Sequence, residues 1–283
     1  MMVGCVFTMK DKTLSLGGYK NVILRKMSDP MTRIMYGIPM TGLLRSEWVL
    51  ARYGLVIPCN WSTADVIQYV ESSSPIGWMV ADARNIIVKT FIERGYEWLI
   101  FIDHDVIIPP FFNLVMNDYI LKKKVPMLSG LYFTKSVPSE PLIYRGRGNS
   151  YFDKWTLDEK VWVDGIPMGC TLIHSSLLKV LWDESPEYNA FGQKTRRVFE
   201  SPTKIQIDPE TRLLYTRVGT EDLELCTRIM NDKIFEKAGW PAYQKKKYPF
   251  LCDTRLFCRH IDWDGTQYPA RGEHQRFVKK KKK

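Results

Sequence analysis

The stretch EWLIFIDHDVIIPPF, residues 97–111, decides how this chain folds. Five apolar residues, Trp98 to Ile102, run directly towards two aspartates, Asp103 and Asp105. A short unbroken apolar run bounded by turn residues predicts a strand that is buried on both faces. Strands of this kind are typical of parallel sheets that helices cover on both sides.

Helical and strand-like patterns alternate on either side of this strand. The apolar spacing predicts helices over residues 44–55, 82–95 and 111–124, and strands within 32–42 and 125–133. Trp48, Leu50 and Leu55 have the spacing of one buried helix face, and Gly95 is the expected stop of the second helix. This alternation favours an α/β fold with a mostly parallel sheet flanked by helices.

A single main domain is expected over residues 32–265, after an N-terminal extension, 1–31, and before a basic tail, 266–283. The length of 283 residues and the apolar content of 45% are ordinary for a globular protein. No stretch reaches the roughly 18 to 20 apolar residues of a membrane span, and the N-terminus lacks the pattern of a signal peptide. Six cysteines without paired spacing indicate reduced thiols in a cytoplasmic protein.

The net charge of +10 is concentrated in three lysine runs, Lys122–Lys124, Lys245–Lys247 and Lys279–Lys283. A basic surface attracts phosphate, whether from a nucleotide, a nucleic acid or an anionic membrane. The plain alternative is that these lysines are solvated residues of loops and of a tail. The charge therefore favours an anionic ligand without naming it.

Asp103 and Asp105 stand where the predicted strand ends. Ligands of open α/β sheets bind outside the carboxyl ends of the strands. If the strand alternation continues, the two carboxylates lie on one side, and His104 faces away. Such a pair can hold Mg²⁺ or Mn²⁺, with water and phosphate oxygens as the other ligands. The alternative is an ordinary surface turn, but the flanking residues are too apolar for an exposed one.

Residues 163–181 predict a glycine-bearing loop, a short strand over Cys170–Ile173, and a helix capped by Ser175 or Ser176. Residues 219–230 predict a second amphipathic helix that begins at Glu221 and Asp222. Leu223, Cys226 and Met230 are expected to face the core. The two acids can carry chemistry, or they can simply stabilise the positive end of the helix dipole.

His260 follows a predicted strand over Leu256–Cys258. A histidine at this place can be a satisfied surface residue, or its imidazole can bind a metal ion. A zinc site formed by Cys252, Cys258 and His260 is a minor alternative, because the spacing matches no common zinc pattern.

Five segments, taken in order, resemble one enzyme family. They are ADARN (81–85), FIDHDV (101–106), MGCTLIH (168–174), TEDLELCTRI (220–229) and CRHID (258–262). The layout looks like the GT-A fold of nucleotide-sugar-dependent glycosyltransferases, particularly the family-2-like enzymes of phages and bacteria. The resemblance covers roughly residues 32–265. One departure is Pro39, which stands where an acidic residue would follow the first strand, so the base-binding loop is unassigned.

The resemblance implies a role for each matching residue. The nucleotide, its diphosphate and the sugar or ribose would be contacted by Asp82, Arg84, Asn85 and Asp103. Mn²⁺ or Mg²⁺ would be bound by Asp103, Asp105 and His260. The catalytic base would be Asp222, with Glu221 beside it. The reaction would transfer a sugar from a nucleotide-diphosphate donor, commonly UDP-linked in this family, to an acceptor hydroxyl. Attack assisted by a base inverts the anomeric centre, although a retaining route also fits a histidine ligand.

Two other functions fit the same residues. A phosphoryl- or nucleotidyl-transferase would use the same carboxylates and metal, without needing the base at Asp222. A non-catalytic nucleic-acid-binding protein would use the lysines and the aromatic residues, which make up 13% of the chain. The acceptor stays open among a nucleic acid, such as modified phage DNA, a glycan, a lipid and a protein, and no motif specifies the oligomeric state.

Overall fold

The computed structural model of the chain describes residues 14–16, 19–22, 32–58, 60–61, 70–73, 79–146, 152, 154–207, 212, 214–218 and 220–273. Within the predicted N-terminal extension, β1 (Leu14–Leu16) and β2 (Tyr19–Val22) pair as antiparallel strands. The rest of that extension and residues 274–283 of the predicted tail lie outside the described residues. The expected domain boundaries therefore stay predictions.

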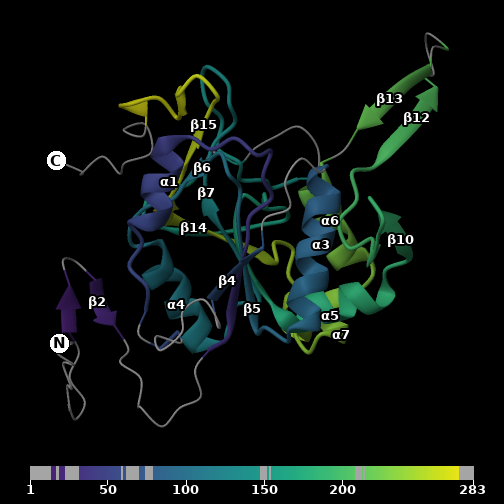
Figure 1. Ribbon diagram of the computed structural model, residues 1–283, viewed down its shortest axis with the longest axis horizontal. Coiled ribbons are helices and arrows are strands. Elements are labelled where there is room, and N and C mark those ends of the chain that lie inside the picture. Colours follow the sequence, from purple (N-terminus) through teal and green to yellow (C-terminus); the bar gives the residue numbers. More distant parts are fainter. Residues whose placement is uncertain are drawn as a thin grey trace.

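A seven-stranded sheet forms the centre of the molecule (Figure 1). Its strand order is β4 (Val70–Ser73), β3 (Ile34–Gly37), β5 (Trp98–Ile102), β9 (Cys170–His174), β7 (Met127–Leu131), β14 (Phe250–Phe257) and β8 (Lys160–Val163). β9 is antiparallel to both of its neighbours, and β8 is antiparallel to β14. The other ladders are parallel, so five of these seven strands point the same way. The predicted α/β class is confirmed.

Helices cover both faces of this sheet (Figure 1). On one face lie α1 (Ser46–Tyr53) and α4 (Phe112–Lys122), and on the other lie α3 (Val80–Glu93), α5 (Ser175–Glu184), α6 (Glu221–Asn231) and α7 (Ile234–Lys237), which α8 (Pro241–Gln244) follows. Trp98, Ile100 and Ile102 of β5 face α1 and α4, and Leu99 and Phe101 face α3. All five side chains are 0% exposed, which explains the unbroken apolar run of β5. Each such side chain contributes about 1.5–3 kcal/mol through its burial.

The helix before β5 ends where the sequence predicts. Gly95 has a φ of +66° and lies just after α3, and its amide donates to the carbonyl of Ile92 at 3.1 Å. Only glycine adopts this backbone conformation at little cost. The chain then turns back into β5, which places the end of β5 near the start of α3.

A second, three-stranded sheet brings the C-terminal part of the chain to the end of β5. It consists of β16 (Gln267–Tyr268), β15 (Arg259–Ile261) and β6 (Val106–Ile107). β14 ends at Phe257, and β15 then pairs with β6, so that His260 lies opposite Val106. The expected strand over 256–258 corresponds to the end of β14, but His260 does not follow a strand as expected, because it is the middle residue of β15.

Two hairpins were not predicted. They are β10 (Glu187–Ala190) with β11 (Gln193–Arg196), and β12 (Thr203–Ile207) with β13 (Leu214–Val218). Figure 1 shows β12 and β13 extending away from the sheet and its helices. β10 and β11 are mostly polar, so they carry little of the apolar pattern by which strands are recognised. The sequence of β12, TKIQI, does alternate polar and apolar residues, and this pattern was missed.

Three predicted details are wrong. Leu50 of α1 is 73% exposed although its spacing suggested a buried face. In α6, Cys226 faces the core as predicted, but Leu225 and Ile229 are the other buried apolar residues, whereas Leu223 and Met230 are only partly buried. The side chain of His174, rather than a serine, caps α5 by accepting the amide hydrogen of Ser176 at 3.2 Å.

Cys170, Cys226, Cys252 and Cys258 are free thiols in the core, as the sequence suggested. Across the part of the chain that the structure describes, no helix is long and apolar enough to cross a bilayer.

Candidate functional site

Three strands of the large sheet end at one place. Asp103 follows β5, Tyr132 follows β7, and Gly169 precedes the antiparallel strand β9. The amide of Asp103 donates to the carbonyl of Gly169 at 3.0 Å, and the amide of Gly169 donates to the hydroxyl of Tyr132 at 2.8 Å. The carboxyl end of the sheet is therefore closed around Asp103, as expected for a ligand site of an α/β fold.

A buried guanidinium holds Asp103 in place. Arg84 of α3 is 2% exposed, and its Nη2 lies 2.9 Å from both carboxylate oxygens of Asp103. Its Nη1 contacts the carboxylate of Glu221, the first residue of α6. Burial lowers the pKa of Arg84, but Asp103 and Asp222 outweigh this effect and hold the pKa above its ordinary value. The guanidinium is thus a permanent charge that ties β5 to the start of α6.

Asp222 lies beside this cluster and is half-buried. Its carboxylate accepts the amide hydrogen of Leu223 at 2.7 Å. Burial, Asp103 and Asp222 together raise the pKa of Tyr132 well above its ordinary value. Burial and then the charge of Asp222 raise the pKa of Tyr144 to about 12. Asp222 is therefore within electrostatic reach of two protonated tyrosines, at the same end of the sheet as Asp103.

Gly169 leaves the space in which this cluster packs. A Cβ at this position would lie 2.7 Å from the hydroxyl of Tyr132 and 2.8 Å from Oδ2 of Asp103. Real Cβ atoms do not approach other atoms so closely, because the steric cost is high. The glycine of the MGC segment is thus required by Asp103 itself.

Residues 103–105 form a turn rather than the last residues of the strand. The amide of Val106 donates to the carbonyl of Asp103 at 3.1 Å, and His104 contacts the carbonyl of Pro39 at 3.2 Å. The expectation that Asp103 and Asp105 continue the alternation of β5 is wrong, because the chain has already left the sheet at these residues. Asp103 and Asp105 consequently have different partners.

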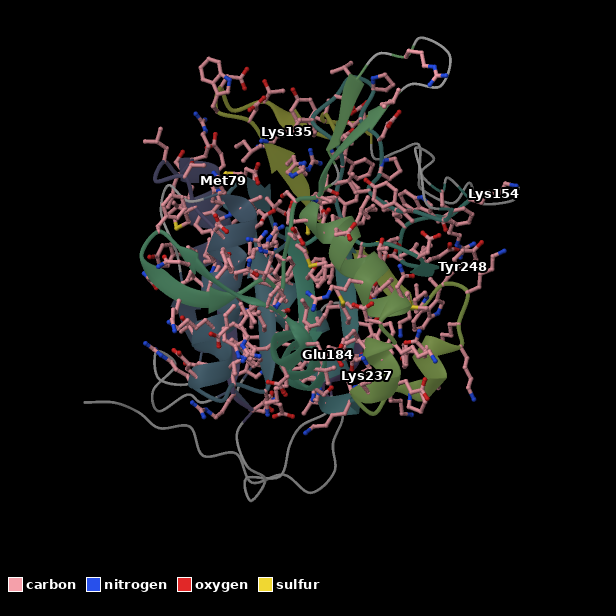
Figure 2. The ribbon with its side chains drawn as sticks, turned by 90° about the vertical axis from the view of Figure 1, so that its right-hand side faces the viewer. Met79, Lys135, Lys154, Glu184, Lys237 and Tyr248 are labelled. Atoms are coloured by element: carbon pink, nitrogen blue, oxygen red, sulfur yellow. The ribbon has the colours of Figure 1, made fainter. Side chains whose placement is uncertain are left out.

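The partner of Asp105 is Lys135, which lies four residues beyond the end of β7. Its Nζ lies 2.8 Å from Oδ2 of Asp105 and 3.9 Å from Oδ1 of Asp262. Burial raises the pKa of Asp105, but His260 and Lys135 outweigh it and hold the pKa below its ordinary value. Figure 2 shows Lys135 near the upper end of the molecule, opposite the Lys237–Glu184 ion pair.

His260 lies next to Asp105, although 155 positions separate them (260 − 105). The amide of Ile261 donates to the carbonyl of Asp105 at 2.8 Å. The Nδ1 of His260 donates to the carbonyl of Phe133 at 2.5 Å, which leaves Nε2 with its lone pair. Burial lowers the pKa of His260 below its ordinary value, and Asp105 opposes that shift only in part. A neutral imidazole oriented in this way is suited to bind a metal ion.

The three predicted metal ligands fit unequally. Asp105 and His260 lie together with an imidazole nitrogen available, whereas both oxygens of Asp103 are bonded to Arg84. In the described ranges, no three His, Cys, Asp or Glu side chains form a group that could hold a metal ion, which also leaves the zinc alternative without support. Asp105 and His260 can serve a divalent ion whose other ligands are phosphate and water, once Lys135 leaves Asp105.

Asp82 and Asn85 do not join the cluster around Asp103. Tyr188 of β10 donates its hydroxyl hydrogen to Asp82 at 2.6 Å. The amide group of Asn85 accepts from the backbone of Phe199 at 2.7 Å and donates to it at 2.9 Å. These contacts fasten the segment of β10 and Phe199 onto α3, and a role in nucleotide binding stays a prediction.

Sequence reasoning missed Tyr132, Lys135 and Tyr144. It also missed Trp48, whose Nε1 donates to the carbonyl of Asp103 at 2.9 Å. Tyr132 and Lys135 follow the end of a strand that was itself predicted. Ligands of α/β sheets bind at the carboxyl ends of the strands, so examining the end of this strand as well as that of β5 would have found both residues.

No protein-family model matches the sequence, and no curated protein is significantly similar to it. Among solved structures, the chain is similar to A197 from STIV, with 16% identity over 89% of this chain and 99% of that chain and a TM-score of 0.48. It is also similar to S. aureus TarS 1-349 in complex with UDP-GlcNAc, with 13% identity over 55% of this chain and 49% of that chain and a TM-score of 0.35. A glycosyltransferase involved in the glycosylation of the major capsid of PBCV-1 has 16% identity over 53% of this chain and 65% of that chain, with a TM-score of 0.26. These TM-scores are all below 0.5.

Proposed function

We propose that this chain is a metal-dependent glycosyltransferase that moves a sugar from a nucleotide-diphosphate donor, with UDP-linked sugars the first to test, to an acceptor hydroxyl. The observation that supports it best is the group of Arg84, Asp103, Glu221 and Asp222. These residues come from three distant segments and meet at the carboxyl end of the sheet. Sugar transfer needs a fixed hydrogen-bond acceptor for the donor and a separate carboxylate for the acceptor hydroxyl.

Asp103 supplies the donor side of this proposal. Both of its oxygens are bonded to Arg84, so the carboxylate cannot rotate, yet its side chain is 20% exposed. A held carboxylate at the end of a strand can accept hydrogen bonds from sugar or ribose hydroxyls. Arg84, which is bonded to two carboxylates, then acts by positioning Asp103 rather than by touching phosphate.

Asp105 and His260 would hold the Mn²⁺ or Mg²⁺ ion. When bound, the ion would neutralise charge on the leaving nucleoside diphosphate. Lys135 borders the same position and places a further positive charge there.

Asp222 is the proposed base. It would take the proton of the acceptor hydroxyl as the acceptor oxygen bonds to the anomeric carbon, while the bond from that carbon to the diphosphate breaks. Attack from the opposite face inverts the anomeric centre. Glu221 is bonded to Arg84, which leaves Asp222 as the acid available for this proton.

The test is a panel of nucleotide-sugars with Mn²⁺, measured by melting temperature and by hydrolysis of the donor. One donor should raise the melting temperature in Mn²⁺ but not in the presence of a chelator. Asp222→Asn should keep that shift and lose hydrolysis, whereas Asp118→Asn, which alters the surface pair with Lys122, should keep both. Absence of any donor-dependent shift would reject the proposal, and turnover of a nucleoside triphosphate with a sugar phosphate would indicate nucleotidyl transfer instead.

A further inference from the structure

The two internal lysine clusters look alike in sequence but differ in their surroundings. In the first cluster, Lys122 pairs with Asp118 at 2.6 Å and Lys123 pairs with Glu97 at 2.6 Å. The second cluster, Lys245–Lys247, follows α8 near the edge strand β8. Carboxylates of the chain thus neutralise most of the charge of the first cluster. The second cluster is the better candidate for binding an external anion.

Aromatic rings surround the second cluster. The Nζ of Lys246 lies 3.8 Å from the ring centroid of Trp162 on β8 and 4.1 Å from that of Tyr243. Lys247 lies 5.3 Å from the ring centroid of Tyr248. An ammonium over an aromatic face is held in place without losing its positive charge.

Arg145 joins this group from another part of the chain. Its guanidinium lies 3.9 Å from the ring centroid of Phe152 and 4.7 Å from that of Tyr248. Its Nε donates to the carbonyl of Trp162 at 2.8 Å. We name these four cations the β8 edge patch: Arg145, Lys245, Lys246 and Lys247.

Among the described residues, no carboxylate pairs with the β8 edge patch. No ion pair joins any of its four cations to a carboxylate within the residues that the structure describes. The carboxylate of Asp164, on the loop after β8, instead accepts the amide hydrogen of Gly146 at 2.6 Å. Lys246 is half-buried against the rings of Trp162 and Tyr243, and this burial lowers the pKa of its ammonium. A bound anion would oppose that shift.

One residue of the β8 edge patch, Arg145, follows a tyrosine that lies near the proposed base. Arg145 follows Tyr144, whose hydroxyl responds to the charge of Asp222. Tyr144 bridges to Gly165, and a Cβ at Gly165 would lie 2.7 Å from Leu223 of α6. The Tyr144–Arg145 segment therefore connects the start of α6 with the edge strand β8, to which Arg145 is bonded through Trp162. In Figure 2, Tyr248 lies at the right-hand side of the molecule, away from the Glu184–Lys237 pair at the bottom.

We propose that the β8 edge patch docks the phosphodiester backbone of a nucleic-acid strand and delivers it as the acceptor to Asp222. This inference rests on the proposed glycosyltransferase function. A row of separate cations without carboxylate partners suits the repeated charges of such a backbone. Each of these aromatic rings already has a cation near its centre, so the patch is expected to bind through charge more than through base stacking.

An anionic membrane surface fits the patch less well. Interfacial binding to lipid requires exposed apolar side chains beside the cations. The large apolar residues that are most exposed in the described chain, Leu43, Tyr53, Val137 and Trp263, lie outside the patch. A strand of nucleic acid needs no such residues.

The test compares two variants that remove the same number of charges. One combines Lys245→Gln, Lys246→Gln and Lys247→Gln, and the other combines Lys122→Gln, Lys123→Gln and Lys124→Gln. Fluorescence anisotropy with a short single-stranded DNA and its duplex gives the affinity at several salt concentrations. The patch variant should bind about ten-fold more weakly, and its salt slope on a single strand should fall by about 0.7 for each phosphate that the variant no longer neutralises. The control variant should stay within about two-fold of the parent.

Equal losses in the two variants would overturn the proposal, because net charge rather than the patch would then govern binding. Binding of vesicles rich in anionic phospholipid, without binding of DNA, would overturn it in favour of a membrane. Arg145→Gln alone should weaken DNA binding in the same direction, since its guanidinium belongs to the patch. The donor-dependent melting shift should persist in all these variants. Loss of that shift in the parent would reject the glycosyltransferase proposal, whatever the DNA result.

Discussion

Asp103 and Asp105 are two residues apart and each has a cationic partner at almost the same distance, yet they differ in burial. The guanidinium of Arg84 lies 2.9 Å from Asp103, and its side chain is 3% exposed. The ammonium of Lys135 lies 2.8 Å from Asp105, and its side chain is 32% exposed. Asp103 is fixed by the buried guanidinium of Arg84. Asp105 is paired with the partly exposed ammonium of Lys135, which water can replace.

This difference shows how one short turn supplies two kinds of carboxylate. A buried ion pair costs much free energy to break, because the remaining partner is left as an unpaired buried charge. A pair near the surface costs little, since water solvates whichever partner remains. Asp103 is therefore suited to hold a fixed position, and Asp105 is suited to exchange Lys135 for a metal ion.

Removing Arg84 should have the largest effect on the molecule. Arg84→Met leaves the carboxylates of Asp103 and Glu221 without their buried partner. The free energy of unfolding should fall by about 3–5 kcal/mol, the scale of one broken buried pair. Urea unfolding measures this change, with Lys135→Met as the comparison at about 1 kcal/mol or less. Similar losses in both variants would remove the distinction between the two carboxylates.

The two acids at the start of α6, Glu221 and Asp222, should also differ in role, one stabilising the fold and the other acting in catalysis. Asp222→Asn should lower turnover by about 10²-fold or more, the scale of a positioned general base, and should leave donor affinity unchanged. Glu221→Gln weakens a buried ion pair, so its main effect should be on the free energy of unfolding. Turnover, donor affinity and urea unfolding are measured for both variants. Loss of turnover in Glu221→Gln at unchanged stability would show that the roles are reversed.

Local patterns were enough to find the main helices and the central strand of the fold. Trp98–Ile102 is the strand that was predicted, and α3 and its stop at Gly95 were predicted to within two residues. These features depend on neighbouring residues, so a window of sequence contains them. The polar hairpin β10–β11 has no such pattern and was missed. The hairpin β12–β13 was also missed, although TKIQI of β12 alternates polar and apolar residues.

The partners of the charged residues could not be found in this way. Arg84 contacts Glu221 from 137 positions away, and which acid it contacts depends on how α6 rotates against α3. Lys135 reaches Asp105 only because two strands end at the same edge of the sheet. The sequence indicated which residues have the right chemistry, but the choice of partner depends on tertiary packing.

Asp105→Ala should affect the metal and leave the fold intact. Its side chain is 29% exposed and is paired with Lys135, so the change in the free energy of unfolding should be about 1 kcal/mol or less. Donor affinity in Mn²⁺ should fall by about ten-fold, to the value measured with a chelator, since Asp105 would supply a metal ligand. Calorimetry measures both affinities, with Asp264→Ala, a change to an aspartate of the loop between β15 and β16, as the control. Equal affinities in Asp105→Ala and the parent would exclude Asp105 from the site.

The smallest effect is expected from Lys135→Met. This variant tests whether the carboxylate of Asp105 can exchange Lys135 for a metal ion. Lys135 and a divalent ion would compete for Asp105, so removing the ammonium should strengthen Mn²⁺ binding in the absence of donor. A pair that is about one-third exposed is worth roughly 1 kcal/mol, which corresponds to about a five-fold change in affinity. Electron paramagnetic resonance counts free Mn²⁺ directly and needs no turnover. Lys123→Met, which breaks the surface pair with Glu97, is the matched control and should leave Mn²⁺ affinity unchanged. If Lys135→Met instead weakens binding of the donor and leaves Mn²⁺ affinity as it was, Lys135 contacts the diphosphate, and Asp105 does not take part in metal binding.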